Sequence, residues 1–167
     1  RIASGPTATA PGASPTAMPA EPDAGLLTSR AEVGQRVAWA RAGHEPFAQA
    51  LADLIVDADT RLAASPDPEE PLDIPGTDGP FVDDSASAYA LALAYVATGD
   101  ERYARHAALY VRAWATTTRS TRHTCTTDGD CQTSLIIGRT APAFIFAADL
   151  IAPSRALTTD DIASFDE

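Results

Sequence analysis

The sequence predicts an all-α protein built of antiparallel helix hairpins, and three observations support this fold class. Alanine, the best helix former, is the commonest residue at 35 of 167 positions. Apolar residues recur at intervals of three and four in several stretches, as they do on the buried face of a helix. Runs of strand-forming residues are scarce. The length suits one domain, or part of a larger one, with a sizeable core.

The first helices are predicted between Ser29 and Leu62. Ser29 and Glu32 form a capping box that opens a short helix, and this helix is expected to stop near Gly43. Pro46 suits the first turn of a second helix. An apolar stripe about five turns long then predicts an amphipathic helix that packs against another: Phe47, Leu51, Leu54, Ile55, Ala58 and Leu62.

Ser65 to Asp84 is predicted to be a long irregular loop. The segment holds five prolines and seven acidic residues, and no basic residue occurs between Arg61 and Arg102. Loops of about 20 residues exceed what packing requires and often form lids or cleft walls. A plain solvated connection is the alternative.

A helix hairpin is predicted to follow this loop. Asp83 or Asp84 can cap a helix from Ser85 to Thr98, which is apolar nearly all round and is therefore expected to be buried on most faces. In the turn that follows, Gly99 can adopt the left-handed conformation and Asp100 can cap the returning helix, which is expected to run from residue 101 to about residue 115. So short a turn requires antiparallel helices.

A second irregular stretch is predicted from Thr116 to Thr133, and it holds both cysteines. Cys125 and Cys131 can pair across five intervening residues, although spacing alone does not establish a disulfide. A zinc site formed by these cysteines with His123 is the weaker alternative, because zinc sites usually place cysteines two to four residues apart. No calcium site is predicted at Asp128 and Asp130, which lack the other ligands.

The last predicted helices begin at Leu135 and near Thr158. Leu135 to Ala152 is expected to be a buried helix, which Pro142 kinks or restarts. Arg139 is the one base inside this apolar stretch, and we expect it to reach an acid, a carbonyl group or a cleft. Thr158 or Thr159 can cap a final short helix that carries Ile162 and Phe165.

The charge balance excludes several function classes. With 23 acidic residues and 12 arginines, the formal charge is −11, and no basic run occurs. Nucleic-acid and membrane-surface binding are therefore not expected. We expect no stretch to supply the roughly 20 apolar residues of a membrane span. Residues 1–28 are rich in alanine, proline and threonine and are predicted to be a flexible segment of the kind that follows a removed signal peptide. We therefore expect a secreted or periplasmic bacterial protein in which the cysteines form a structural disulfide.

The predicted hairpin resembles one in a known enzyme family. Residues 88–115, AYALALAYVATGDERYARHAALYVRAWA, are similar to the hallmark hairpin of the alginate lyase superfamily of polysaccharide lyases. Residues 132–151 provide a second match, a loop followed by an arginine-bearing helix that ends in Ala-Ala-Asp-Leu-Ile. The Thr-Thr-Asp-Asp-Ile-Ala-Ser-Phe segment near the end is the third. The resemblance covers about residues 45–167.

This resemblance implies part of an incomplete α/α toroid, with residues 29–167 as its N-terminal portion and a cleft for a uronic-acid polymer. The implied reaction is β-elimination without a metal or nucleotide cofactor. Gln132 and Arg139 match substrate-contacting positions of related lyases. His123 and Tyr89 are expected to line the same cleft, although a plain loop histidine and a core aromatic are the alternatives.

The sequence also departs from the family pattern. It contains no Asn, so the Asn of the family's Asn-His pair is missing, and no catalytic residue can be assigned. We therefore expect a fragment that is inactive by itself. The alternatives are a glycoside hydrolase on a similar toroid, using acids such as Asp83, Asp84 and Asp149, and a non-catalytic carbohydrate-binding module. An acidic polymer requires arginines at the cleft, and Arg119, Arg122 and Arg139 are the candidates. The oligomeric state is left open.

Overall fold

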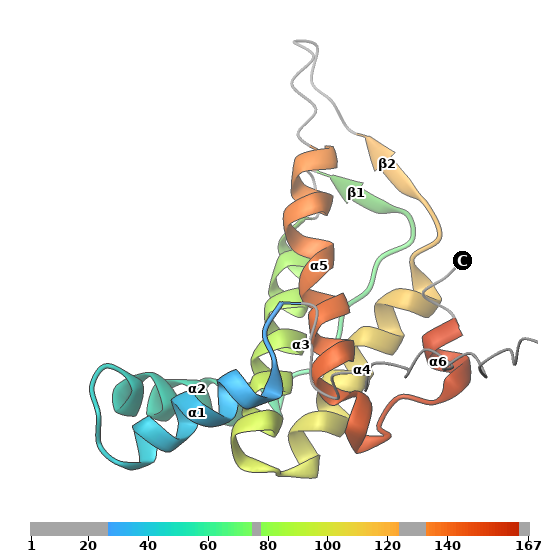
Figure 1. The fold of residues 1–167 in the computed structure, drawn as a ribbon. Helices are drawn as coiled ribbons and strands as arrows, with labels where there is room; N and C mark the ends of the chain where they lie inside the picture. Colours follow the sequence, from blue (N-terminus) through green and yellow to red (C-terminus); the bar gives the residue numbers. More distant parts are fainter. Residues whose placement is uncertain (1–26, 75–77, 124–132, 164–167) are drawn as a thin grey trace, which may run out of the picture.

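The computed structural model describes residues 27–74, 78–123 and 133–163, and Figure 1 shows their arrangement. These residues are mostly helical, so the all-α prediction is confirmed. The toroid implied by the resemblance stays a prediction. The elements in chain order are α1 (Arg30–Arg41), α2 (Phe47–Arg61), β1 (Leu72–Ile74), α3 (Asp78–Thr98), α4 (Glu101–Thr117), β2 (Thr121–His123), α5 (Thr133–Ile151), the 3₁₀ helix η1 (Ala152–Ser154) and α6 (Thr159–Ala163).

Helices α1 and α2 form a hairpin, called the arm below, that projects from the rest of the molecule (Figure 1). The predicted capping box is present: the Ser29 side chain accepts a hydrogen bond from the Glu32 backbone, and the Glu32 carboxylate accepts one from the Ser29 backbone. The turn contains Gly43 at φ 78°, a conformation that favours glycine. Both arm helices thus lie where the sequence pattern predicts them.

Helix α3 lies at the centre of the fold and packs against α1, α2, α4 and α5. Its alanines permit this close packing, and Ala88, Leu91, Ala92 and Ala94 are fully buried. The predicted turn into α4 is confirmed, with Gly99 at φ 76°. Asp100 accepts a hydrogen bond from the Arg102 backbone at the start of α4.

The prediction of an irregular loop from Ser65 to Asp84 is wrong in its second half. Residues 72–74 form strand β1, and α3 begins at Asp78, seven residues before the predicted start. Pro80 does not prevent this, because the backbone N–H groups of a first helical turn have no partner within the helix. Consequently Asp83 and Asp84 do not cap α3 and lie within it.

The irregular stretch predicted from Thr116 to Thr133 is shorter than expected. Helix α4 continues to Thr117, strand β2 follows, and α5 already begins at Thr133. Strands β1 and β2 pair in parallel, with Leu72 opposite Thr121 and Ile74 opposite the backbone of His123. Strands of this length are too short to show an alternation of apolar and polar residues in the sequence. Their pairing depends on contacts between distant segments.

The core is aromatic and aliphatic and lies between α3, α4 and α5. Phe81, Trp114 and Phe144 pack together, with ring centroids 5.1 to 5.9 Å apart. Tyr110 and Leu91 are the largest fully buried side chains of α4 and α3. Pro142 lies inside α5, which continues through it. The final helix α6 is joined to α4 by ion pairing of Arg112 and Asp161.

By length and composition, one helix in the described part of the chain could cross a membrane, namely Thr133–Ser154, which combines α5 and η1. This corrects the expectation that no apolar stretch approaches that length. Core helices pass the same test, and α5 packs along α3 and α4. The length of this helix is therefore weak evidence for a membrane span.

Candidate functional site

Two regions of the molecule hold the residues that the sequence singles out. The first, called the strand-pair end, consists of β1, β2 and the first two turns of α3 and of α5. Figure 1 shows these four parts at one end of the helical bundle, opposite the Gly99 turn. The second is a pocket between the arm and α3, called the arm pocket.

Hydrogen bonds between distant segments hold the strand-pair end together. The Glu70 carboxylate accepts hydrogen bonds from the backbone of Arg119 and from both the backbone and the hydroxyl of Ser120, the hydroxyl at 2.6 Å. These hydrogen bonds lower the pKa of Glu70. The Leu72 backbone N–H also donates to the Ser120 carbonyl at 3.0 Å. The segment before β1 is thereby fixed to the segment before β2.

A buried carboxylate, Asp84, joins this end to the core. Its Oδ2 atom accepts a hydrogen bond from Trp114 Nε1 at 2.7 Å and another from the Asp67 backbone at 2.8 Å. The residue is 7% exposed, and this burial raises the pKa of Asp84 above its ordinary value despite the two hydrogen bonds. Sequence reasoning placed Asp84 at a helix cap or in a hydrolase pair. In the structure it anchors the segment that leads into β1.

The strand-pair end carries two of the predicted arginines on its surface. Arg122 of β2 has a side chain that is 63% exposed and lies 3.9 Å from the Asp73 carboxylate, a loose ion pair. Arg139 lies in the second turn of α5 and is also exposed. The expectation that Arg139 reaches an acid, a carbonyl group or a cleft stays a prediction. Both guanidinium groups are accessible to an acidic ligand.

Several predicted residues cannot be judged. The backbone of His123 belongs to β2, opposite Ile74. Gln132, Cys125 and Cys131 lie outside the described residues. The disulfide and the roles of Gln132 and His123 therefore stay predictions. Within the described part of the chain, no three histidine, cysteine or acidic side chains are arranged to hold a metal ion.

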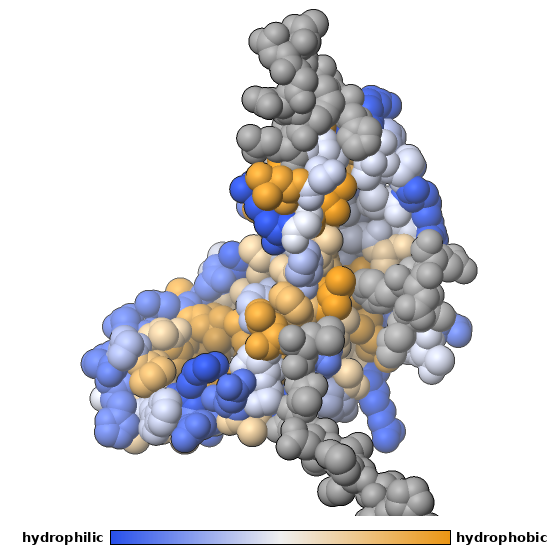
Figure 2. Space-filling view, turned by 45° about the horizontal axis from the view of Figure 1, so that its top comes forward, coloured by the Kyte–Doolittle hydropathy of each residue, from blue (hydrophilic) through white to orange (hydrophobic). Residues whose placement is uncertain are grey.

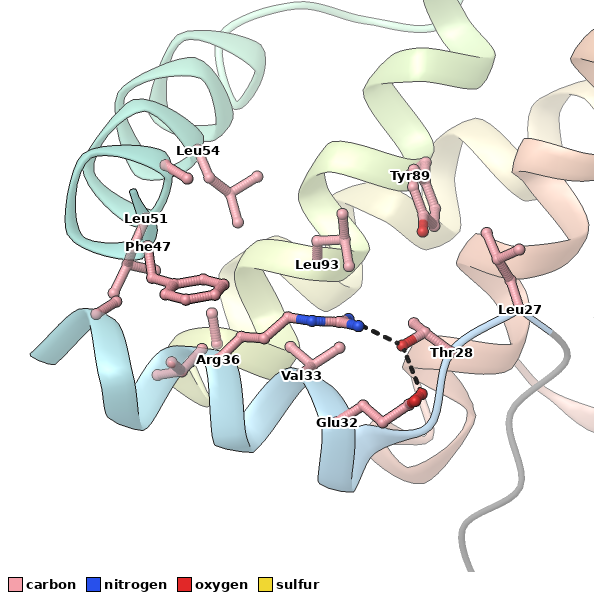
Figure 3. Close-up of a pocket in the computed structure, with 14 residues that line it drawn as sticks. Leu27, Thr28, Glu32, Val33, Arg36, Phe47, Leu51, Leu54, Tyr89 and Leu93 are labelled. Carbon is pink, nitrogen blue, oxygen red and sulfur yellow. Dashed lines mark hydrogen bonds between the residues drawn. The ribbon is translucent and has the colours of Figure 1, made fainter. Parts of the chain in front are cut away.

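The arm pocket contains the remaining predicted residue, Tyr89. It has a volume of about 490 Å³ and lies between α1, α2 and α3 (Figure 3). Most of its lining is apolar, with Phe47, Leu51 and Leu54 from α2 and Leu93 from α3. Figure 2 shows apolar surface along the arm that continues toward the bundle. Neither Arg122 nor Arg139 lines this pocket.

Polar groups gather at one corner of the arm pocket. Arg36 Nη1 donates to the Thr28 hydroxyl at 3.5 Å, and this hydroxyl donates to the Glu32 carboxylate at 3.1 Å. Tyr89 points its hydroxyl toward the same corner (Figure 3). Burial raises the pKa of Tyr89, and the positive charge of Arg36 acts in the opposite direction. No sequence signal pointed to Arg36, because the pocket is formed by three helices together.

Hydrogen bonds from both arm helices hold the arm to the bundle, and in α1 Arg30 and Arg41 donate to the carbonyl groups of Leu150 and Ala97. Arg61 of α2 donates to the Ser87 hydroxyl of α3 at 2.6 Å. Tyr103 of α4 donates from its hydroxyl to the Asp59 carboxylate at 2.7 Å. These contacts set the distance between α2 and the bundle, and the arm pocket lies beside them.

The comparisons with known proteins complete this description. No curated protein and no solved structure matched the chain. The family model described as alginate lyase matches residues 77–167, which is more than half of the chain. The match covers α3, α4, β2, α5 and α6, and it starts later than the expected position near Glu45. The family resemblance is confirmed, with a polysaccharide substrate and a polysaccharide-lyase-like function as its implications. The chain belongs to the alginate lyase family.

Proposed function

We propose that the protein takes part in the cleavage of a uronic-acid polymer by β-elimination. The family match over residues 77–167 is the observation that carries this proposal. Such a reaction removes the weakly acidic proton from C5 of a uronate. A cationic or hydrogen-bonding group must therefore neutralise the C6 carboxylate and stabilise the negative charge that develops. A base then takes the C5 proton, and an acid protonates the departing glycosidic oxygen.

The strand-pair end is the region that we assign to the polymer. Arg122 and Arg139 are exposed there and can pair with uronate carboxylates. The family resemblance adds Gln132 and His123 as further substrate contacts in this proposal. The anchoring of this end by Glu70 and Asp84 supports the assignment, because a surface fixed in advance binds with less loss of conformational entropy.

The catalytic step is not assigned to any residue of this chain. The family resemblance implies an Asn that grips the substrate carboxylate, and the sequence contains no Asn. We therefore propose that these 167 residues bind a polyuronate and do not cleave it by themselves. The secreted or periplasmic location and the disulfide remain part of this proposal.

Binding and cleavage can be tested together on the 167-residue chain. We expect retention on alginate or polyglucuronate that falls with added salt, no retention on neutral dextran, and no increase in the ultraviolet absorbance of unsaturated uronates. The double variant Arg122→Ala/Arg139→Ala should bind about tenfold more weakly, because two charge-assisted contacts are lost. Arg105→Ala, at an exposed position of α4, is the matched control.

Each other outcome contradicts part of the proposal. Equal binding to dextran, or unchanged binding by the double variant, would show that the strand-pair end is not the binding site of the polymer. Unsaturated product from the chain alone would show that the residues present suffice for catalysis. New reducing ends without unsaturated product would indicate a hydrolase.

A further inference from the structure

The arm pocket has the dimensions and lining of a small-molecule site. Its volume of about 490 Å³ lies in the range of roughly 300–1,000 Å³ that is typical of ligand pockets. Such pockets combine a mainly apolar wall with a few converging polar groups. A sugar acid fits this wall poorly, because its hydroxyl groups would lie against Leu51, Leu54 and Leu93 without hydrogen-bond partners.

The polar corner has unused hydrogen-bond donors. A guanidinium group carries five N–H donors, and Arg36 uses one of them, in the long bond to Thr28. Within the described part of the chain, the Tyr89 hydroxyl makes no hydrogen bond. Both groups point to the same corner in Figure 3. An anion placed there can accept from Arg36 and Tyr89 at once.

The neighbouring acid does not occupy these donors. The Glu32 carboxylate accepts from the Ser29 backbone at 3.0 Å and from Thr28, so it is committed to the capping of α1. These hydrogen bonds and the charge of Arg36 lower the pKa of Glu32. Glu32 itself lines the pocket, so its negative charge opposes a bound anion, but it does not occupy the Arg36 donors.

We propose that the arm pocket binds a small monocarboxylate with an aliphatic body, of the kind of a medium-chain fatty acid. The carboxylate pairs with Arg36 and accepts a hydrogen bond from Tyr89. The aliphatic body lies along Leu51, Leu54 and Leu93. Eleven of the fourteen lining residues precede Thr77, so this site belongs mainly to the arm and not to the family-matched part of the chain.

Octanoate is the probe for this site, and octan-1-ol and glucuronate are its matched comparisons. We expect titration calorimetry on the 167-residue chain to show saturable binding of one octanoate per chain. Octan-1-ol should bind about tenfold more weakly because it lacks the charge, and glucuronate should not bind. Trp39 packs on the pocket residue Phe47 at 5.0 Å between ring centroids, so its fluorescence should report occupancy.

Single substitutions separate the contributions of the pocket residues. Arg36→Gln should weaken octanoate binding about tenfold, and Tyr89→Phe about threefold. Glu32→Gln keeps the capping box and removes the opposing charge, so it should strengthen binding. Arg105→Gln is the control for a loss of positive charge elsewhere, and it should bind as the parent does.

A second kind of variant tests the apolar wall. Ala50 lines the pocket and is otherwise exposed, so Ala50→Trp should fill the cavity without unfolding the arm, as circular dichroism can verify. This variant should bind neither octanoate nor octan-1-ol.

Three results would overturn the proposal. Equal binding of octanoate and octan-1-ol, unchanged in Arg36→Gln, would indicate an unspecific apolar surface. Preferred binding of glucuronate would assign the pocket to sugar acids. Self-association that Ala50→Trp abolishes and octanoate leaves unaffected would assign it to a second copy of the chain.

Discussion

The strand-pair end and the arm are attached to the same central helix by contacts of different kinds. At the strand-pair end, the buried Asp84 joins two distant segments by hydrogen bonds to Trp114 and Asp67. The arm is attached through arginines, among them Arg61, which donates to the Ser87 hydroxyl, and through Tyr103, whose acceptor Asp59 is exposed. The carboxylate that anchors the strand-pair end is therefore buried, whereas the carboxylate that holds the arm is exposed.

The two regions therefore differ in how readily they can change shape. A buried polar group that loses its hydrogen-bond partner destabilises the fold, so the strand-pair end has few alternatives to its present arrangement. The arm keeps an open apolar pocket and exposes Val56 at 68% and Trp39 at 39%. We therefore expect the strand-pair end to be preorganised and the arm to adjust more readily to a ligand.

The largest expected effect comes from removing the buried anchor. Asp84→Ala leaves the Trp114 indole N–H and the Asp67 backbone N–H without their acceptor. We expect the free energy of unfolding to fall by about 3 kcal/mol, since each unpaired buried donor costs about 1–3 kcal/mol. Urea denaturation followed by circular dichroism measures this loss.

Neighbouring variants test this explanation. Asp83→Ala, at an exposed position one residue earlier, should change the stability little. Asp84→Asn keeps an acceptor and should cost less than Asp84→Ala. Because the pKa of Asp84 is raised in the folded state, the Asp84 carboxylate is protonated at a higher pH in the folded protein than in the unfolded chain. The parent should therefore gain stability relative to Asp84→Asn on acidification, and the opposite trend would contradict a buried, desolvated carboxylate.

A smaller loss is expected from the attachment of the arm. Tyr103→Phe removes the hydroxyl that donates to the Asp59 carboxylate at 2.7 Å and leaves the buried ring in place. We expect a decrease of about 1 kcal/mol in the free energy of unfolding, because the accepting carboxylate is exposed and can be rehydrated. Tyr95→Phe, at a half-buried position of α3, is the control. A loss as large as that of Asp84→Ala would contradict the contrast between the two regions.

Local sequence signals predicted most of the helix ends of this fold, but not the start of α3. The Ser29–Glu32 capping box, the turn at Gly99 and the cap at Asp100 are all where the sequence indicates. Each of these features depends on residues within four positions of one another.

Features that depend on distant segments were not predicted. Strands β1 and β2 have three residues each and exist because segments about 50 residues apart exchange hydrogen bonds. The partner of Asp84 is Trp114, 30 residues away, so a helix cap was the only local explanation for that acid. Arg36 was missed for the same reason, because the arm pocket arises from the packing of three helices. Substrate contacts at Gln132 and His123 could be proposed only from the family resemblance.

The smallest expected effects come from two exposed glutamates, one in each region. Hydrogen bonds lower the pKa of Glu70 at the strand-pair end and that of Glu32 in the arm below the ordinary value of 4.5. An acid with a lowered folded-state pKa stabilises the fold above its unfolded pKa, and this contribution is lost as the pH falls through the folded value. Below about pH 4.5 we therefore expect hydrogen-exchange protection to decrease at Leu72 in β1 and at Val33 in α1. Glu70→Gln should abolish this pH dependence in β1 alone, and Glu32→Gln in α1 alone. If either variant altered the pH dependence in both regions, the arm and the strand-pair end would be one cooperative unit, and the contrast drawn between them would be wrong.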